Sequence, residues 1–353
     1  MTSRRSRARI ARTRAPASPV AQRWAAVTSN KYALTTAVTV GALAVSAMVN
    51  RARARNAERE NPPIGAFIEV DGVRLHYLER GQGQPLVLLH GNGSMIQDFD
   101  SSGLIDMAAE KYRVIVFDRP GFGHSDRPRS TIWTPEAQAA LIQAALRQIG
   151  VERAIVLGHS WGASVAVALA VNYEAMVQAL VLASGYYFPT VRADVVAFSG
   201  PAIPVVGDVL RHTVSPILGR AIWPLLMRKI FGPADVPAKF DAFPSEMALR
   251  PSQIRASAAE SALMIPAAVA ARASYGELKM PVVIVAGEED RLIDIDDQSA
   301  RLHEEIPGST LHRVPGAGHM VHQTATEQVM SAIDEAARAA GQRRPAGMMS
   351  AAA

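Results

Sequence analysis

A chain of 353 residues, of which 49% are hydrophobic, is long enough to bury one large core or two ordinary ones. It contains no cysteine, which excludes disulfides, thiolate metal sites and a cysteine nucleophile. The net charge of +5 is uneven, because the first 60 residues carry 12 basic and 2 acidic side chains and the remainder is mildly acidic. We therefore expect no surface for nucleic acid on the main body of the protein.

Residues 1–60 predict a basic tail followed by a single membrane anchor. An Arg-rich segment precedes an uncharged run at about 32–49, which would reach roughly 27 Å as a helix. A cleaved export signal and a soluble or surface-lying helix are the alternatives, and Arg51, Arg53 and Arg55 argue against cleavage just before them. In a spanning helix, the heavier basic load in front favours a cytoplasmic N-terminus, with the large domain on the far side of the membrane.

After a proline-marked linker at 61–66, the chain alternates between predicted strands and helices. The dipeptide Asp71-Gly72 predicts a hairpin turn. Continuous apolar runs, each typical of a strand buried on both faces, lie at 85–90, 114–117, 154–157, 179–183, 281–286 and, more weakly, 310–314. Helical patterns such as 134–149 separate them. This alternation predicts an α/β fold with a mostly parallel central sheet flanked by helices and a ligand site at the carboxyl ends of the strands.

The alternation stops between 187 and 275, where the chain carries ten prolines and long Ala-rich stretches. Such a segment favours several broken helices inserted over the sheet edge, which we term the cap. The predicted core then consists of 61–186 and 276–341, and 342–353 is predicted to be a flexible tail.

The stretch GHSWG places Ser160 between Gly158 and Gly162, directly after a predicted buried strand and at the start of a predicted helix. A nucleophile on a sharp strand-to-helix turn needs small residues on both sides, because larger ones would collide with the neighbouring backbone. We therefore predict that Ser160 is a nucleophile, with a helix-capping serine as the alternative interpretation.

A serine nucleophile requires a base and an acid that orients the base. In this topology the acid follows a late strand and the histidine comes last, which selects Asp290 and His319. His322 is the main rival of His319, and His159, although adjacent to the serine, is expected to point elsewhere. Other acids near Asp290 remain open as alternatives: Glu289, Asp294 and Asp296.

The oxyanion of the intermediate needs two hydrogen-bond donors. We predict that these are the backbone N–H groups of Trp161, the residue after the nucleophile, and of Asn92, in the HGNG loop. His90 in that loop is expected to be structural rather than a base.

The segments LLHGNG, FDRPGFGHSDRP, GHSWG, AGEEDRLID and PGAGHMVH together resemble the α/β-hydrolase superfamily, over about residues 67–339. The resemblance implies a mobile cap that lines the acyl or leaving-group pocket. It also implies that Asp118, His124 and Ser125 belong to a structural loop. Haloalkane dehalogenases and epoxide hydrolases in this superfamily carry Asp at the turn, so Ser160 favours acyl transfer.

These features predict a membrane-bound carboxylic ester hydrolase for a small to medium apolar substrate, with no cofactor and no metal. The His319 and His322 spacing lacks the acidic or cysteine partners that a metal pair would need. A cofactor-free haloperoxidase or perhydrolase and a carbon–carbon bond hydrolase share the same triad and remain alternatives. A non-catalytic ligand-binding relative is a further one. Nothing in the sequence indicates an oligomeric state.

Overall fold

The computed structural model describes residues 18–20, 22–23 and 31–342. Its centre is one sheet of eight strands: β1 (Ala66–Val70), β2 (Val73–Arg80), β3 (Gln84–Leu89), β4 (Tyr112–Phe117), β5 (Ala154–His159), β6 (Val177–Ala183), β7 (Val282–Gly287) and β8 (Thr310–Val314). The six strands predicted from apolar runs are confirmed, with ends within two residues of the predicted ones. Most of the predicted basic tail, and the predicted C-terminal tail beyond Gln342, lie outside the described residues.

The sheet has the order β1-β2-β4-β3-β5-β6-β7-β8 and is mostly parallel, as predicted. β1 and β2 form the predicted hairpin, in which Asp71 and Gly72 have φ values of 49° and 72°. Two left-handed residues in a two-residue loop match the twist of the flanking strands. β2 also pairs antiparallel with β4, whereas all pairs from β4 to β8 are parallel. The carboxyl ends of β3, β5, β7 and β8 therefore meet at one edge of the sheet.

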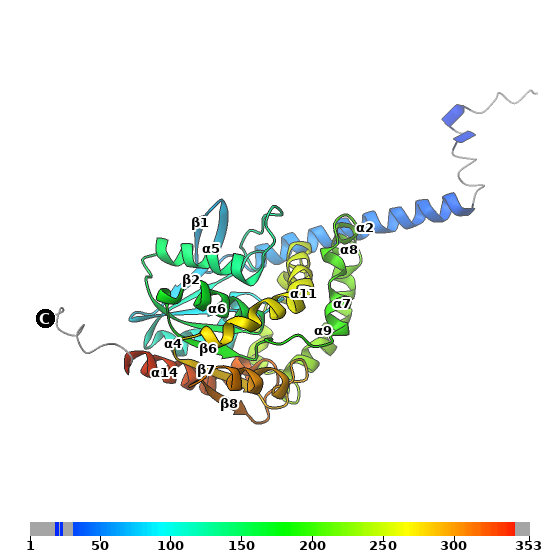
Figure 1. Ribbon diagram of the computed structural model, residues 1–353. Helices are drawn as coiled ribbons and strands as arrows, with labels where there is room; N and C mark the ends of the chain where they lie inside the picture. Colours follow the sequence, from blue (N-terminus) through cyan, green and yellow to red (C-terminus); the bar gives the residue numbers. More distant parts are fainter. Residues whose placement is uncertain (1–17, 21, 24–30, 343–353) are drawn as a thin grey trace, which may run out of the picture.

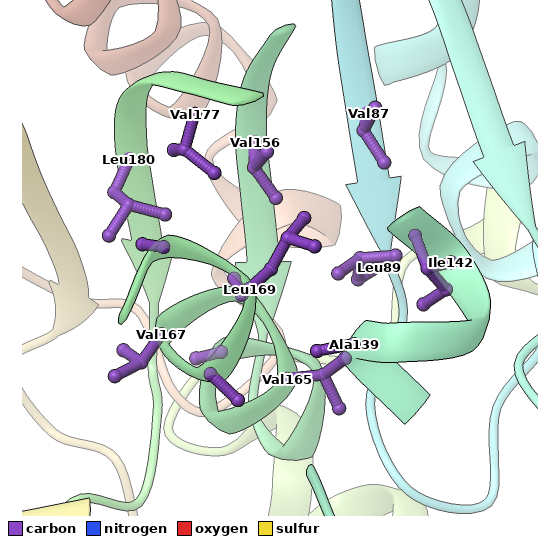
Figure 2. Packing of buried hydrophobic residues seen from close by; sticks show 14 of the residues in the cluster. Val87, Leu89, Ala139, Ile142, Val156, Val165, Val167, Leu169, Val177 and Leu180 are labelled. Carbon is purple, nitrogen blue, oxygen red and sulfur yellow. The ribbon is translucent and has the colours of Figure 1, made fainter. Parts of the chain in front are cut away.

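Helices cover both faces of the sheet (Figure 1). One face packs against α5 (Pro135–Gln148) and α6 (Trp161–Asn172). Figure 2 shows Val156 of β5 beside α6, and Ile142 of α5 near Leu89. The other face packs against α3 (Ile96–Ser102), α4 (Leu104–Ala109) and α14 (Thr326–Gln342), while α12 (Arg301–Glu305) and α13 (Val321–Thr324) are short connecting helices. Successive strand side chains enter opposite cores, which explains the continuous apolar runs.

Every element between β6 and β7 is helical: α7 (Ala193–Phe198), α8 (Val206–His212), α9 (Ser215–Phe231), α10 (Ser245–Ala248) and α11 (Pro251–Ala271), with short 3₁₀ turns at Gly200–Ala202, Ala238–Ala242 and Arg272–Glu277. In Figure 1, α7, α8 and α9 lie at one end of the molecule, beside α2 (Lys31–Glu60). α11 contacts α6 on one side and α7, α8 and α9 on the other. It therefore connects this helical layer to the body that carries the sheet.

α2 is a single helix that continues well past residue 49, where the predicted anchor ends. The additional segment is rich in Ala, Arg and Glu, which are strong helix formers. It is also held by contacts with the body, since Ala57 is buried and Glu58 Oε1 accepts a hydrogen bond from Arg250 at 2.7 Å. By length and composition, α2 and α11 are the helices of the described chain that could cross a membrane, and the apolar window of α2 is wholly exposed.

A buried ion pair joins the loop after β4 to α11. Arg119 donates to both carboxylate oxygens of Glu260, at 2.5 and 3.0 Å, and neither side chain is exposed. Gln138 of α5 donates to the same carboxylate at 3.0 Å. The remaining Arg119 donors reach the carbonyl oxygens of His90 and Gly91. Arg119 therefore links the helical layer to the loop after β3.

Glu260→Gln removes the charge that compensates Arg119 at this buried position. Loss of one partner leaves the other charge buried and uncompensated, so we expect the free energy of unfolding to fall by about 3 kcal/mol. The matched control is Glu246→Gln, which removes one charge of the partly exposed pair with Arg220. It should lower the free energy of unfolding by less than about 1 kcal/mol. Denaturant unfolding of the purified protein measures both free energies. Equal losses in the two variants would contradict the proposed importance of the buried pair.

Candidate active site

Ser160 occupies a sharp turn between β5 and α6. Its backbone has φ 53° and ψ −120°, a conformation that residues with side chains rarely adopt. A Cβ on Gly158 would lie 2.3 Å from the carbonyl oxygen of Gly162, and one on Gly162 would lie 2.1 Å from that of Leu89. Only glycine fits at both positions. The turn therefore holds Ser160 at the carboxyl end of β5, in contact with the end of β3.

The structure brings Ser160, His319 and Asp290 together in one chain of hydrogen bonds. Ser160 Oγ donates to His319 Nε2 at 3.0 Å, and His319 Nδ1 donates to Asp290 Oδ2 at 2.8 Å. The other Asp290 oxygen accepts from the backbone N–H groups of Leu292 and Ile293, at 2.8 and 3.0 Å. The carboxylate thus keeps the histidine proton on Nδ1 and leaves Nε2 free to accept the serine proton.

The acids that remained as alternatives have other partners. Glu289 Oε2 accepts from the backbone N–H of Gly316 at 2.8 Å. Asp294 Oδ1 accepts from the backbone N–H groups of Asp296 and Asp297, the arrangement of a helix cap. Asp296 itself pairs with Arg313 at the surface. Within the described part of the chain, Asp290 is the acid that contacts the ring of His319.

The loop after β3 packs directly on the serine, because a Cβ on Gly91 would lie only 3.1 Å from Ser160 Cβ. His90 holds this loop: its Nδ1 donates to the carbonyl oxygen of Gly91 at 2.8 Å, and its Nε2 accepts from the backbone N–H of Arg119 at 3.0 Å. Burial, reinforced by the charge of Arg119, lowers the pKa of His90 to about 3. The ring is therefore neutral, and its geometry is that of a structural residue.

Asn92 and Trp161 flank the serine on two different segments. The side chain of Asn92 points into the helical layer, where Nδ2 donates to Ser257 O at 3.1 Å and Ser261 Oγ at 3.2 Å. Trp161 is the first residue of α6, and N–H groups of a first turn have no partner within the helix. The positive end of the α6 dipole lies at the same place.

Two further histidines are buried behind His319. His159 Nε2 donates to the backbone carbonyl of His319 at 3.0 Å, so it supports the loop of His319. Burial, together with the nearby His322 and His319, lowers the pKa of His159 well below its usual value. His322 Nε2 donates to Asp98 Oδ1 at 3.0 Å. Burial alone would raise the pKa of Asp98, but the charge and hydrogen bond of His322 hold it well below its usual value.

Asp98, His159 and His322 are also the described residues whose donor atoms could hold a metal, since these atoms lie within 4.8 Å of one another. Both carboxylate oxygens of Asp98 already have hydrogen-bond partners, however. Oδ2 accepts from Ser94 Oγ at 2.8 Å, and Oδ1 accepts from both His322 and Gln323. A metal would have to displace these bonds. We assign the cluster to the attachment of α3 to the loop of His319.

The segment after β4 has the features of a structural loop, as the resemblance implies. Asp118 is buried and accepts from His76 Nδ1 at 2.7 Å, and from the backbone N–H groups of Ile96 and His124 at 2.9 Å each. Ser125 Oγ donates to the carbonyl oxygen of Asp118. These bonds tie β2, α3 and the loop after β4 together.

Two acids that support the site were not predicted from the sequence. Glu260 is separated by 141 residues from Arg119, and Asp98 by 224 residues from His322. Glu260 does carry a local indication, because it is the single acid in the Ala-rich sequence of α11. An acid within a mostly apolar helix is rarely buried unless it is paired.

A family model for the alpha/beta hydrolase fold matches residues 84–326. The haloalkane dehalogenase 2 of Mycobacterium tuberculosis is 26% identical over 275 residues, which cover 74% of this chain and 91% of that protein.

Solved structures show the same fold. A thermophilic esterase from Thermogutta terrifontis superposes with a TM-score of 0.65 and 21% identity, covering 78% of this chain and 99% of that one. A membrane phospholipase A, described as a bacterial virulence factor, has a TM-score of 0.60 and 21% identity, covering 90% of this chain and 100% of that one. The three proteins bear the names of different activities, so their names do not determine a substrate class for this chain.

The lowered pKa of His90 predicts a specific loss of stability in acid. The pKa is about 3 in the folded chain and near 6.5 in the unfolded chain, so protons bind preferentially to the unfolded chain between these values. Through this group, each pH unit below 6.5 should lower the free energy of unfolding by up to about 1.4 kcal/mol. His90→Gln should show a correspondingly shallower decline from pH 6.5, measured by denaturant unfolding at several pH values. If the free energy of unfolding fell with the same slope in the parent and in His90→Gln, the lowered pKa of His90 would be contradicted.

Proposed function

The chain belongs to the alpha/beta hydrolase fold family, and on that premise we propose that it is a membrane-tethered serine hydrolase that cleaves carboxylic esters with small to medium apolar groups. The observation that carries the proposal is the chain of hydrogen bonds from Ser160 through His319 to Asp290, at a strained turn that only glycine neighbours allow. A histidine Nε2 at 3.0 Å from a serine hydroxyl is the arrangement that general-base activation requires.

The proposed reaction proceeds through an acyl-enzyme. His319 Nε2 takes the proton of Ser160 as Oγ attacks the ester carbonyl, and Asp290 stabilises the resulting imidazolium. The backbone N–H groups of Asn92 and Trp161 donate to the oxyanion. His319 then gives its proton to the departing alcohol. In the second half, His319 removes a proton from water, the water attacks the acyl carbon, and the proton returns to Ser160 as the acid leaves. No step needs a metal or an organic cofactor.

Two features favour an apolar ester as the substrate. Ser160 stands where haloalkane dehalogenases and epoxide hydrolases carry Asp, and a serine forms an acyl ester rather than an alkyl one. In addition, Met95 of the loop after β3 and Met320, next to His319, belong to a buried apolar cluster with Met227 and Phe231 of α9. The surroundings of the proposed base are therefore apolar on this side.

The proposed organisation follows the sequence predictions. Residues 1–60 form the basic tail and the anchor, 61–186 and 276–341 form the hydrolase core, and 187–275 form the cap. The exposed, uncharged part of α2 supports the single-pass anchor. The heavier basic load before this segment favours a cytoplasmic N-terminus and a catalytic domain on the other side of the membrane.

Ser160→Ala should abolish both ester hydrolysis and labelling by a fluorophosphonate probe, because the attacking oxygen is lost. Ser164→Ala, in the next turn of α6, is the matched control and should keep both. The measurements are gel fluorescence after labelling and turnover of p-nitrophenyl esters of increasing acyl length. Labelling that survives Ser160→Ala, or wild-type protein that is folded yet fails to label, would refute the serine hydrolase.

Asp290→Asn should lower kcat by roughly 10⁴-fold, because an amide no longer keeps the His319 proton on Nδ1. Asp294→Asn changes an acid four residues away whose carboxylate caps exposed backbone, so its kcat should stay within about twofold of the parent. Steady-state kinetics on a single ester distinguish the two variants. The reverse ranking would assign the orienting acid to Asp294.

A further inference from the structure

Exposed apolar side chains are concentrated in two segments that meet at one end of the molecule. Of the 24 large hydrophobic side chains exposed in the described residues, 12 lie between Val191 and Leu225, and seven lie on the 32–49 part of α2. Figure 1 shows the corresponding elements, α7, α8, α9 and α2, at the same end of the molecule. Soluble proteins rarely leave so many apolar side chains together in water, so this end of the protein requires a partner.

α9 carries this apolar surface as a continuous stripe. Its exposed positions recur at spacings of three and four residues, which places them on one face of the helix: Val214, Ile217, Leu218, Ala221, Ile222 and Leu225. The opposite face is buried through Met227 and Phe231. At the end of the stripe the exposed residues become Arg228 and Lys229. An apolar outer face that ends in basic residues is typical of a helix that lies in a membrane interface.

Asp208 and Arg211 of α8 and Arg220 of α9 do not interrupt this surface as isolated charges, because each is paired. Asp208 Oδ1 accepts from Arg211 at 2.9 Å and from Arg129 at 2.7 Å. Arg220 donates to Glu246 at 2.7 Å. Moving a charge towards lipid costs less free energy when the charge is paired than when it is isolated.

α2 is attached to the beginning of α9 by polar contacts that are buried or partly buried. Ser46 Oγ donates to the carbonyl oxygen of Thr213 at 2.8 Å, and Asn50 Nδ2 donates to the same oxygen at 2.9 Å. Arg220 of α9 donates to Asn50 Oδ1 at 3.1 Å. The apolar stripe starts at Val214, the next residue after Thr213. The stripe is therefore continuous with the segment that we propose to span the bilayer.

The length of α2 indicates where along the helix the boundary of the bilayer would lie. From Tyr32 to Val45, before the first contact with Thr213, α2 extends only about 21 Å, which is short of a hydrocarbon core of roughly 30 Å. The whole uncharged run to Val49 gives about 27 Å. The boundary of the bilayer thus has to reach the level of Ser46 and Asn50, where α9 begins.

We propose that the outward apolar face of α9, with the adjoining exposed residues of α7 and α8, lies on the lipid bilayer that α2 crosses. The inference rests on the membrane tether of the proposed function. The stripe from Val214 to Leu225 enters the acyl boundary, and Arg228 and Lys229 contact lipid phosphates.

This docking bears directly on the proposed active site. The backbone N–H of His319 donates to the carbonyl oxygen of Ile230 in the last turn of α9, at 3.0 Å. A Cβ on Gly318 would lie 2.2 Å from the carbonyl oxygen of Gly232, so the two segments are in close contact. The docked helix therefore holds the catalytic loop next to the lipid surface, and esters dissolved in the bilayer are the substrate class that this position favours.

The absence of cysteine makes the docking directly measurable, since an introduced cysteine is the only thiol. Full-length Leu218→Cys and, as the matched control, Ser331→Cys on the exposed side of α14 are labelled with an NBD fluorophore. Each protein is reconstituted in vesicles of phosphatidylcholine and phosphatidylglycerol. We expect doxyl-labelled lipid to quench the probe at 218 several-fold more than the probe at 331, and aqueous iodide to show the opposite order.

Two results would overturn the proposal. Iodide access at 218 equal to that at 331 would show that the stripe faces water. Shielding of 218 from both quenchers would show that protein, such as a second copy of this chain, covers it. Protein that does not float with the vesicles would instead refute the tether on which the docking rests, and fluorophosphonate labelling of Ser160 in the same samples reports the hydrolase activity separately.

A charged variant tests the consequence for substrate. Leu218→Asp/Leu225→Asp should reduce hydrolysis of a long-chain ester embedded in vesicles by about tenfold, and leave hydrolysis of a short soluble ester within about twofold. Gln328→Asp/Ser331→Asp, with equal added charge on α14, should change neither rate. Equal loss on both esters in the α9 variant, or no loss on either, would contradict docking by this face.

Discussion

The backbone contacts around Ser160 are the constraint on which the rest of the molecule depends. The end of β3, the turn after β5 and the start of α6 approach so closely that no side chain fits at Gly158 or Gly162. This crowding maintains the strained backbone of Ser160 and fixes the direction of Oγ. It also positions the loop of Asn92, because Gly91 packs on the serine itself. The parallel sheet is what brings these segments to one edge.

Buried polar contacts then connect the helices between β6 and β7 to this centre. Arg119 binds the loop after β3 and Glu260 of α11 at the same time, Asn92 donates to α11, and Ile230 of α9 accepts from His319. The helical layer therefore touches both the proposed oxyanion loop and the proposed base. In the proposed docking, the bilayer contacts a helix whose last turn is bonded to the loop of His319, so the proposed attachment and the proposed catalysis would share one structural element.

Local patterns in the sequence were enough to predict the strands, the hairpin at Asp71-Gly72 and the turn at Ser160, because each depends on neighbouring residues. The sequence favoured Asp290 over several nearby acids by its position after a late strand, and the folded loop adds the backbone N–H groups of Leu292 and Ile293 that hold its carboxylate. The partners Glu260 and Asp98 could not be predicted, since their contacts join positions far apart in the chain. The extension of α2 beyond residue 49 depends on packing against the body, which hydropathy does not report.

The most direct test of the central claim is a crystal structure of the protein after reaction with a fluorophosphonate, whose phosphonyl group mimics the tetrahedral intermediate. We expect a covalent bond from phosphorus to Ser160 Oγ. We also expect a phosphonyl oxygen about 3 Å from the backbone nitrogens of Asn92 and Trp161, with His319 Nε2 facing the departed group. An adduct on another residue, or a phosphonyl oxygen that points away from both nitrogens, would contradict it.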